Sequence, residues 1–133
     1  MNYIKLLKDH NLKITPQRLV IVESVYNYGH INIDKLYAKI KEIFTTISLA
    51  TIYKNIHIMS EKGLIKEVKI PDEKNVYELT KKEHSHIVCT KCHSITDIEL
   101  NTKELVNQAT VLSDFQIDKS AIVFNGICKE CVA

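Results

Sequence analysis

Four cysteines stand in two Cys-x-x-Cys pairs, and their spacing suits a metal ion. Cys89 and Cys92 form the first pair, and Cys128 and Cys131 form the second. Two intervening residues allow a tight turn to direct both sulfurs of a pair toward one point. Two such turns complete the Cys₄ set that structural Zn²⁺ prefers. Two disulfides or a thiol redox pair are the alternatives. Because the chain has four cysteines in all, the pattern favours a closed, structural zinc site.

A second group of candidate ligands lies just before the first cysteine pair. His84 and His86 alternate along a strand-like segment, so both imidazoles project from one face. Two ligands do not suffice to hold a selective divalent ion. Taken alone, His30 would usually be a solvated loop residue, and Glu78 and Asp97 would usually be surface carboxylates. The histidine pair therefore indicates a second metal site whose other ligands must come from elsewhere in the chain.

Length and charge distribution favour two small domains. The cysteine pairs close the two ends of a segment too small to be very stable alone, which leaves enough of the 133 residues for another compact unit. We expect a first domain at residues 1–80 and a second at residues 81–133. Residues 1–83 carry 14 basic and 10 acidic side chains, whereas residues 84–133 carry 4 and 6. The first domain is thus the better candidate for a polyanionic partner.

The chain shows no secretory or membrane signal. No positively charged leader precedes an apolar stretch at the N-terminus, and no apolar run approaches the length that spans a bilayer. We therefore expect a cytoplasmic protein without a membrane partner, in a compartment where thiols remain reduced.

The first domain is predicted to consist of four helices followed by a hairpin. Capping residues before amphipathic runs, and glycines after them, mark the helix ends. The first predicted helix covers residues 2–11, and the second runs from Pro16, after a Thr15 cap, to near Gly29. The third begins after an Asn32 cap. The fourth begins at a Ser48 cap and stops at Gly63. Tyr26, Leu49, and Ile43 or Phe44 are assigned to buried faces. Residues 64–79, interrupted by a polar turn, predict two strands. This order of elements indicates a winged helix-turn-helix.

The helix after Ser48 carries side chains suited to a DNA major groove. Opposite its apolar stripe lie Thr51 and Lys54, with Tyr53 and Asn55 beside them. Hydroxyl, amide, aromatic and cationic groups match the donors, acceptors and thymine methyls that base pairs present there. An ordinary solvated helix face is the alternative, and the order of elements favours DNA.

The second domain is predicted to be a small α/β unit, which makes the whole chain α+β. The predicted strands cover residues 87–89, 95–100, 115–117 and 121–127, and a helix capped by Thr102 covers residues 102–112. A small sheet with one helix exposes an edge and an apolar face. We expect homodimerisation to bury them, and a self-sufficient monomer is the alternative.

Three segments together resemble the ferric-uptake-regulator (Fur) family. They are the Thr-Pro-Gln-Arg run at 15–18, residues 48–56, and the His-x-His and Cys-x-x-Cys run at 84–92. The resemblance implies a dimeric, metal-activated transcription factor that binds double-stranded operator DNA. It also implies an N-terminal winged helix and a C-terminal α/β dimerisation domain. Tyr53 would read bases, while Arg18 and Lys13 would hold phosphates or the narrow minor groove. The candidate DNA-contacting residues are Lys13, Thr15, Arg18, Ser48, Thr51, Tyr53, Lys54 and Asn55.

The same resemblance supplies the missing ligands of the second metal site. It adds His30, Glu78 and Asp97 to His84 and His86. Three imidazoles and two carboxylates without a thiolate suit Fe²⁺ or Mn²⁺. Because these ligands come from both domains, one ion would fix the angle between them and bias a dimer toward the shape that binds DNA.

Details of the sequence bear on which signal is sensed. The chain resembles the peroxide-sensing branch of the family in having Asp97. It also has Ser85 and Ser120 at positions where iron regulators may carry further metal ligands. In that branch, bound Fe²⁺ would lead to oxidation of His30 or His84, whereas Mn²⁺ would support repression without a peroxide response. Glu78 departs from the best-known peroxide sensors, so an Fe²⁺-responsive iron-uptake regulator is the alternative.

Two other functional classes fit the sequence less well. A hydrolytic metalloenzyme needs an open coordination position, which five candidate ligands would nearly fill. The chain also has no nucleophile motif or glycine-rich phosphate loop among its three glycines. A zinc-stapled interaction module without DNA binding is the second alternative, and steeply salt-dependent operator binding would distinguish the repressor from it.

Overall fold

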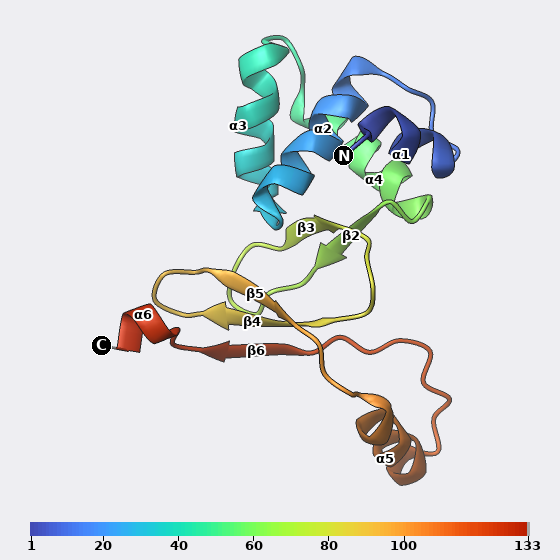
Figure 1. Cartoon of the computed structure of the whole chain (residues 1–133), viewed down its shortest axis with the longest axis vertical. Helices are drawn as coiled ribbons and strands as arrows, with labels where there is room; N and C mark the ends of the chain where they lie inside the picture. Colours follow the sequence, from blue (N-terminus) through green and yellow to red (C-terminus); the bar gives the residue numbers. More distant parts are fainter. Residues whose placement is uncertain (133) are drawn as a thin grey trace. The chain divides into compact units, whose positions relative to one another are not determined.

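The computed structural model describes residues 1–132 and divides the chain into two compact units, Met1–Lys81 and Lys82–Ala133. The predicted α+β class is confirmed, since each unit combines helices with a small three-stranded sheet (Figure 1). None of the helices in residues 1–132 has the length and apolar character needed to cross a bilayer.

Four helices open the first unit, and a side-chain cap begins each of them. They are α1 (Tyr3–Asp9), α2 (Pro16–Tyr28), α3 (Ile33–Ile43) and α4 (Leu49–Glu61). Asn2, Thr15, Asn32 and Ser48 each accept a hydrogen bond from the backbone N–H three residues later, over 2.9–3.2 Å. These bonds satisfy N–H groups that the first helical turn leaves open. The predicted Thr15, Asn32 and Ser48 caps are confirmed.

A three-stranded antiparallel sheet closes the first unit. Its strands are β1 (Ile31–Asn32), β2 (Ile65–Val68) and β3 (Val76–Leu79), in the order β1-β3-β2. The hairpin of β2 and β3 is the predicted wing. The short strand β1 was not predicted, because two residues carry no periodicity. It pairs Ile31 with Tyr77, and this register positions a site residue described below.

The hydrophobic core of the first unit lies between the helices and the sheet. Its buried side chains include Leu7 of α1, Val22 of α2, Ile40 of α3 and Ile56 of α4. Two predictions about this core are wrong. Tyr26 is 48% exposed, with its ring edge-on to that of Tyr3 at 6.1 Å, and Leu49 in the first turn of α4 is 39% exposed. Phe44, rather than Ile43, packs against the core at the end of α3.

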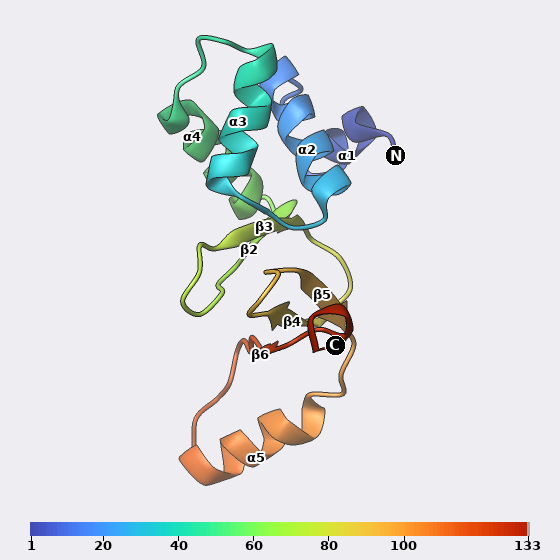
Figure 2. The same cartoon turned by 90° about the vertical axis from the view of Figure 1, so that its left-hand side faces the viewer.

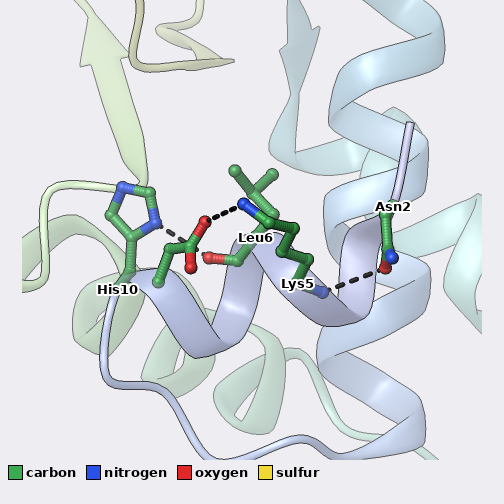
Figure 3. A network of polar contacts seen from close by, with 5 residues as sticks. Asn2, Lys5, Leu6 and His10 are labelled. Atoms are coloured by element: carbon green, nitrogen blue, oxygen red, sulfur yellow. Dashed lines mark hydrogen bonds and ion pairs between the residues drawn. The ribbon is translucent and has the colours of Figure 1, made fainter.

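Polar contacts hold the short helix α1 in shape (Figure 3). The Asn2 side chain caps its N-terminus, and the Lys5 ammonium donates to the Asp9 carboxylate over 3.1 Å. His10 at the C-terminal end places Nδ1 2.8 Å from the backbone oxygen of Leu6. This bond satisfies a carbonyl near the end of the helix, where intrahelical donors run out.

The second unit is built on the sheet β5-β4-β6 (Figure 2). Its elements are β4 (Ser85–Cys89), β5 (Ile95–Ile98), α5 (Lys103–Ser113), β6 (Val123–Gly126) and α6 (Lys129–Val132). Strand β4 pairs antiparallel with β5 and parallel with β6. A parallel pair needs a long connection, and the segment from β5 through α5 provides it.

Two predictions for the second unit require correction, and one element was missed. Residues 115–117 form no strand, because Phe115 is 70% exposed and no neighbouring strand pairs with this segment in the described chain. Thr102 precedes α5 as predicted, but its side chain makes no capping bond, and Asn101 instead accepts from the backbone N–H of Lys103. The short helix α6 was not predicted.

Helix α5 has no buried residue within the described chain. Leu105 is 56% exposed, Val111 77% and Leu112 86%. Both views show the helix lying away from the sheet of its own unit (Figures 1 and 2). An amphipathic helix of this kind gains most of its stability from packing its apolar face, and residues 1–132 provide no surface that buries the apolar side chains of α5.

Candidate metal centres and nucleic-acid interface

The four cysteines converge in the second unit. Cys89 ends β4, and Cys92 follows in a tight turn. Cys128 immediately precedes α6, and Cys131 lies within it. All four sulfurs lie within 4.8 Å of one another, and Sγ of Cys92 lies 3.7 Å from Sγ of Cys128. A tetrahedral ion with Zn–S bonds of about 2.3 Å requires sulfurs roughly 3.8 Å apart. The cluster therefore has the donor type and dimensions of a structural zinc site.

Backbone N–H groups prepare one of these sulfurs to be a thiolate. The N–H groups of Cys92 and Cys128 point at Sγ of Cys89 over 3.5 and 3.3 Å. These two donors lower the pKa of Cys89 to about 6. The neighbouring Cys128 thiol raises the pKa of Cys131 to about 12. Four close sulfurs resist full ionisation without a cation, so the set is suited to a divalent metal.

The turn between Cys89 and Ser94 uses a left-handed residue. His93 has φ +63°, and its N–H donates to the carbonyl oxygen of Cys89 over 2.9 Å, while the N–H of Cys89 donates to that of Ser94 over 3.0 Å. This conformation favours glycine, although histidine tolerates it better than most residues. His93 therefore serves the turn beside the cysteine cluster through its left-handed backbone conformation.

Nitrogen and oxygen donors gather at the other end of β4. His86 faces Asp97 across the β4–β5 ladder, with Nε2 3.4 Å from Oδ1, and His84 Nε2 lies 3.5 Å from the same oxygen. The two imidazole centroids are 4.6 Å apart, and both side chains are 6% exposed. The structure thus brings together three of the predicted ligands within the second unit.

A backbone carbonyl selects the tautomer of His84. Nδ1 lies 2.8 Å from the carbonyl oxygen of Lys82, which accepts a proton and donates none. Neutral His84 therefore carries its proton on Nδ1 and presents the Nε2 lone pair to Asp97. An outer hydrogen bond of this kind orients metal-binding histidines.

The first unit contributes a separate histidine–carboxylate pair. His30 immediately precedes β1, so the pairing of Ile31 with Tyr77 brings His30 opposite Glu78. The two side chains meet at 3.0 Å, from Nε2 to Oε2, and Glu78 is 1% exposed. A buried carboxylate is costly without a cationic or hydrogen-bonding partner, and this contact is an ion pair only when the imidazole is protonated. Only the register of β1 predicts this contact, and a strand of two residues has no detectable pattern in the sequence.

The donor types in the two units fit a metal of intermediate hardness. Each unit offers imidazole nitrogen and carboxylate oxygen, and the chain's cysteines all belong to the zinc cluster. Fe²⁺ and Mn²⁺ bind imidazole and carboxylate readily, whereas softer ions prefer thiolate ligands.

The candidate DNA-contacting residues fall into three groups. Lys13, Thr51, Tyr53 and Lys54 are exposed, with Tyr53 at 45%. Thr15 and Ser48 use their hydroxyl oxygens as helix caps. Arg18 and Asn55 are half-buried and bonded to each other, because Nε of Arg18 donates to Oδ1 of Asn55 over 3.1 Å. The exposed face of α4 therefore offers a hydroxyl, a phenol and an ammonium group to a groove.

The fold and these sites define a winged-helix protein whose two units both carry side chains of metal-ligating type. The chain belongs to the Ferric uptake regulator family, whose family model matches residues 9–125. This is a family of transcriptional regulators and not of enzymes.

Individual relatives are similar over nearly the whole chain. The peroxide-responsive repressor PerR of Staphylococcus epidermidis is 32% identical over 127 residues, covering 94% of this chain and 85% of the relative. The solved Campylobacter jejuni peroxide stress regulator is 36% identical with a TM-score of 0.69, covering 98% of this chain and all of that one. The Vibrio cholerae ferric uptake regulator is 25% identical with a TM-score of 0.74, covering 96% and 100%, and its described rearrangement concerns DNA-binding domains.

Proposed function

We propose that this protein is a metal-dependent, DNA-binding transcriptional repressor that senses peroxide through oxidation of a metal-binding histidine. The observation that carries the proposal is the convergence of His84 and His86 on Asp97, in a chain whose winged-helix unit has its own His30–Glu78 pair. The similarity to two proteins named as peroxide regulators supports the same conclusion.

DNA binding is assigned to the first unit. Its excess of basic side chains attracts a polyanion, and Thr51, Tyr53 and Lys54 on α4 are exposed. The order of helices and wing suits insertion of α4 into a major groove. The partner is double-stranded operator DNA in the cytoplasm.

Two kinds of metal site divide structure from regulation. Zn²⁺ bound by the four cysteines would stabilise the second unit. Fe²⁺ or Mn²⁺ would take its ligands from His30 and Glu78 of the first unit and His84, His86 and Asp97 of the second. One ion holding all five would tie the units to a single relative arrangement. If that arrangement binds DNA best, metal and DNA strengthen each other's binding.

A homodimer would place two winged helices on one operator. The apolar face of α5, with Leu112 86% exposed, lacks a cover within the described chain. A second copy of the same face supplies a matching apolar surface with two-fold symmetry. Dimerisation also follows from energetics, because two half-sites bound together hold DNA far more tightly than one small winged helix does.

Peroxide sensing consumes one imidazole carbon–hydrogen bond. His30 and His84 are the residues whose ring would be oxidised, and bound Fe²⁺ would pass electrons from the imidazole to the peroxide. In the net change one oxygen atom of H₂O₂ would enter a ring C–H bond and the other would leave as water, so the imidazole would lose the two electrons that the peroxide gains. The oxidised ring is a poorer ligand, and the metal-dependent arrangement is lost together with DNA binding.

An Fe²⁺-responsive iron-uptake regulator is the second candidate. Glu78 favours it, because the best-known peroxide sensors have aspartate there, and its carboxylate is fully buried against His30. Such a protein would bind DNA with the same metal but release it only when iron is removed.

The two candidates separate in one experiment. Zinc-loaded protein is bound to operator DNA with Fe²⁺ in the absence of oxygen, a small excess of H₂O₂ is added, and DNA release is followed together with peptide masses. Release with one added oxygen on a peptide containing His30 or His84 supports peroxide sensing. Binding that persists until iron is chelated supports the iron regulator. A parallel Mn²⁺ sample is the control, and it should neither release DNA nor gain oxygen.

A further inference from the structure

The side chain of Asn55 connects the start of α2 to α4. Its Oδ1 accepts from Nε of Arg18 over 3.1 Å, and its Nδ2 donates to the backbone oxygen of Thr51 over 3.0 Å. Nη1 of Arg18 in turn donates to the carbonyl oxygen of Lys13 over 2.9 Å. A long cationic side chain is thus fastened at two points before any nucleic acid arrives.

These contacts leave the Asn55 amide in only one suitable orientation. The guanidinium has donors and no acceptor, and a backbone carbonyl accepts and does not donate. A reversed amide would place its NH₂ group against the guanidinium and its oxygen against the Thr51 carbonyl. Both ends of the Asn55 side chain are therefore engaged inside the protein. In contrast, Thr51, Tyr53 and Lys54 on the same helix are exposed.

Arg18 keeps binding capacity beyond these two bonds. A guanidinium carries five N–H groups, of which one on Nε and one on Nη1 are used. The remaining donors can reach a phosphate, which planar guanidinium groups bind well. Ordering the side chain in advance removes part of the entropic cost that a flexible arginine would pay on binding.

We propose that Asn55 is a positioning residue, which holds Arg18 against α4 so that phosphate contact and base reading share one register. Asn55 acts on DNA through Arg18 and reads no base itself. This inference rests on the DNA-binding function proposed above. It separates Asn55 from Tyr53 and Lys54, with which the sequence alone had grouped it.

Affinity measurements test the coupling between the two residues. Wild type, Asn55→Ala, Arg18→Ala and the double variant are compared as zinc-replete, Mn²⁺-loaded full chains, on a duplex selected by the wild type from a random library. We expect Asn55→Ala to weaken binding about tenfold when Arg18 is present and less than about twofold when it is absent. Discrimination among duplexes with single base-pair changes should stay as in the wild type. The matched control Lys54→Ala should weaken binding equally in both backgrounds.

Two results would overturn the proposal while leaving DNA binding intact. One is an equal loss from Asn55→Ala with and without Arg18. The other is a loss of preference at one base pair in Asn55→Ala, which would make Asn55 a base-reading residue. Wild-type protein that selects no duplex would overturn both the DNA-binding function and this inference.

A second measurement needs no DNA. In NMR spectra of the free protein, the Nε–H proton of Arg18 should exchange slowly with water in the wild type and rapidly in Asn55→Ala. Asn55→Asp keeps an acceptor and should retain slow exchange, as should Lys54→Ala. An Arg18 signal that Asn55→Ala leaves unchanged would refute the contact, whatever the affinities show.

Discussion

Replacing one zinc ligand should unfold the second unit and leave the first intact. Among the apolar residues of the second unit that the structure describes, only Val88 and Cys89 are buried. The first unit, by comparison, has a core cluster of 14 buried side chains. Full burial of a side chain such as Val88 contributes about 1.5–3 kcal/mol. The second unit therefore has little apolar burial to support it without its metal, and Cys92→Ser is the chosen perturbation.

The size of the effect follows from the span that the metal closes. Cys92 and Cys128 are 36 positions apart. A covalent cross-link that closes such a loop lowers the entropy of the unfolded chain and so raises its free energy by about 4 kcal/mol. A zinc ion that joins the same two segments acts in a similar way, and its bond to the Cys92 thiolate is lost in the variant. The stabilisation lost with this bond is larger than the stabilisation that burial of Val88 provides, so this unit should lose its cooperative fold.

Two-dimensional ¹H–¹⁵N NMR distinguishes the units residue by residue. In Cys92→Ser, or in wild-type protein stripped of zinc by a chelator, signals of residues 82–132 should collapse toward unfolded positions while those of the first unit stay dispersed. Ser94→Ala is the matched control, because its Oγ lies 3.2 Å from Cys92 Sγ without being a predicted ligand. Dispersed second-unit signals and an unchanged melting curve in the stripped protein would refute the structural role of zinc.

Three further expectations concern backbone strain, pH and assembly. His93→Gly should change stability by between zero and about 1 kcal/mol in the favourable direction, since it removes left-handed strain but adds freedom to the unfolded chain; a lower melting temperature of the zinc protein would contradict this. Burial, followed by the nearby Glu67 carboxylate, raises the pKa of Tyr77 from 10.0 to about 12, so the unfolded chain loses this proton first and stability falls as pH rises from 10 to 12. Tyr77→Phe should show a shallower fall than wild type in denaturant titrations at pH 9 and 11, and equal slopes would exclude Tyr77 as the cause. Leu112→Glu should leave the monomer folded but shift sedimentation toward monomer, because that side chain is 86% exposed in one chain; an unaltered dimer would remove α5 from the interface.

Local signals predicted much of the fold. A hydroxyl or amide side chain followed by an amphipathic run was enough to locate the starts of α2, α3 and α4, because a cap bonds an N–H only three residues away. The Cys-x-x-Cys spacing likewise identified sulfurs that meet in space. In both cases the information lies within a few residues of the feature.

Features that depend on distant partners were missed or wrong. Strand β1 exists because Ile31 meets Tyr77, and the two residues of this strand carry no pattern of their own. Phe115 has strand propensity but no neighbouring strand in the described chain to pair with. Asn55 has a side chain of the type that reads bases. In the structure, however, its Oδ1 accepts a hydrogen bond from Arg18, 37 positions away. Such contacts are properties of the assembled fold.

Metal bound by the histidine–carboxylate ligands should drive DNA binding. A Mn²⁺ titration of zinc-loaded protein tests this directly when it is monitored by the fluorescence anisotropy of a labelled operator duplex, for wild type and His84→Ala. Operator binding by the wild type should rise with Mn²⁺ and reverse with a chelator that spares zinc, while His84→Ala should retain its zinc but gain no affinity. Operator binding that ignores Mn²⁺, or a variant that titrates like the wild type, would contradict a regulatory role for these ligands.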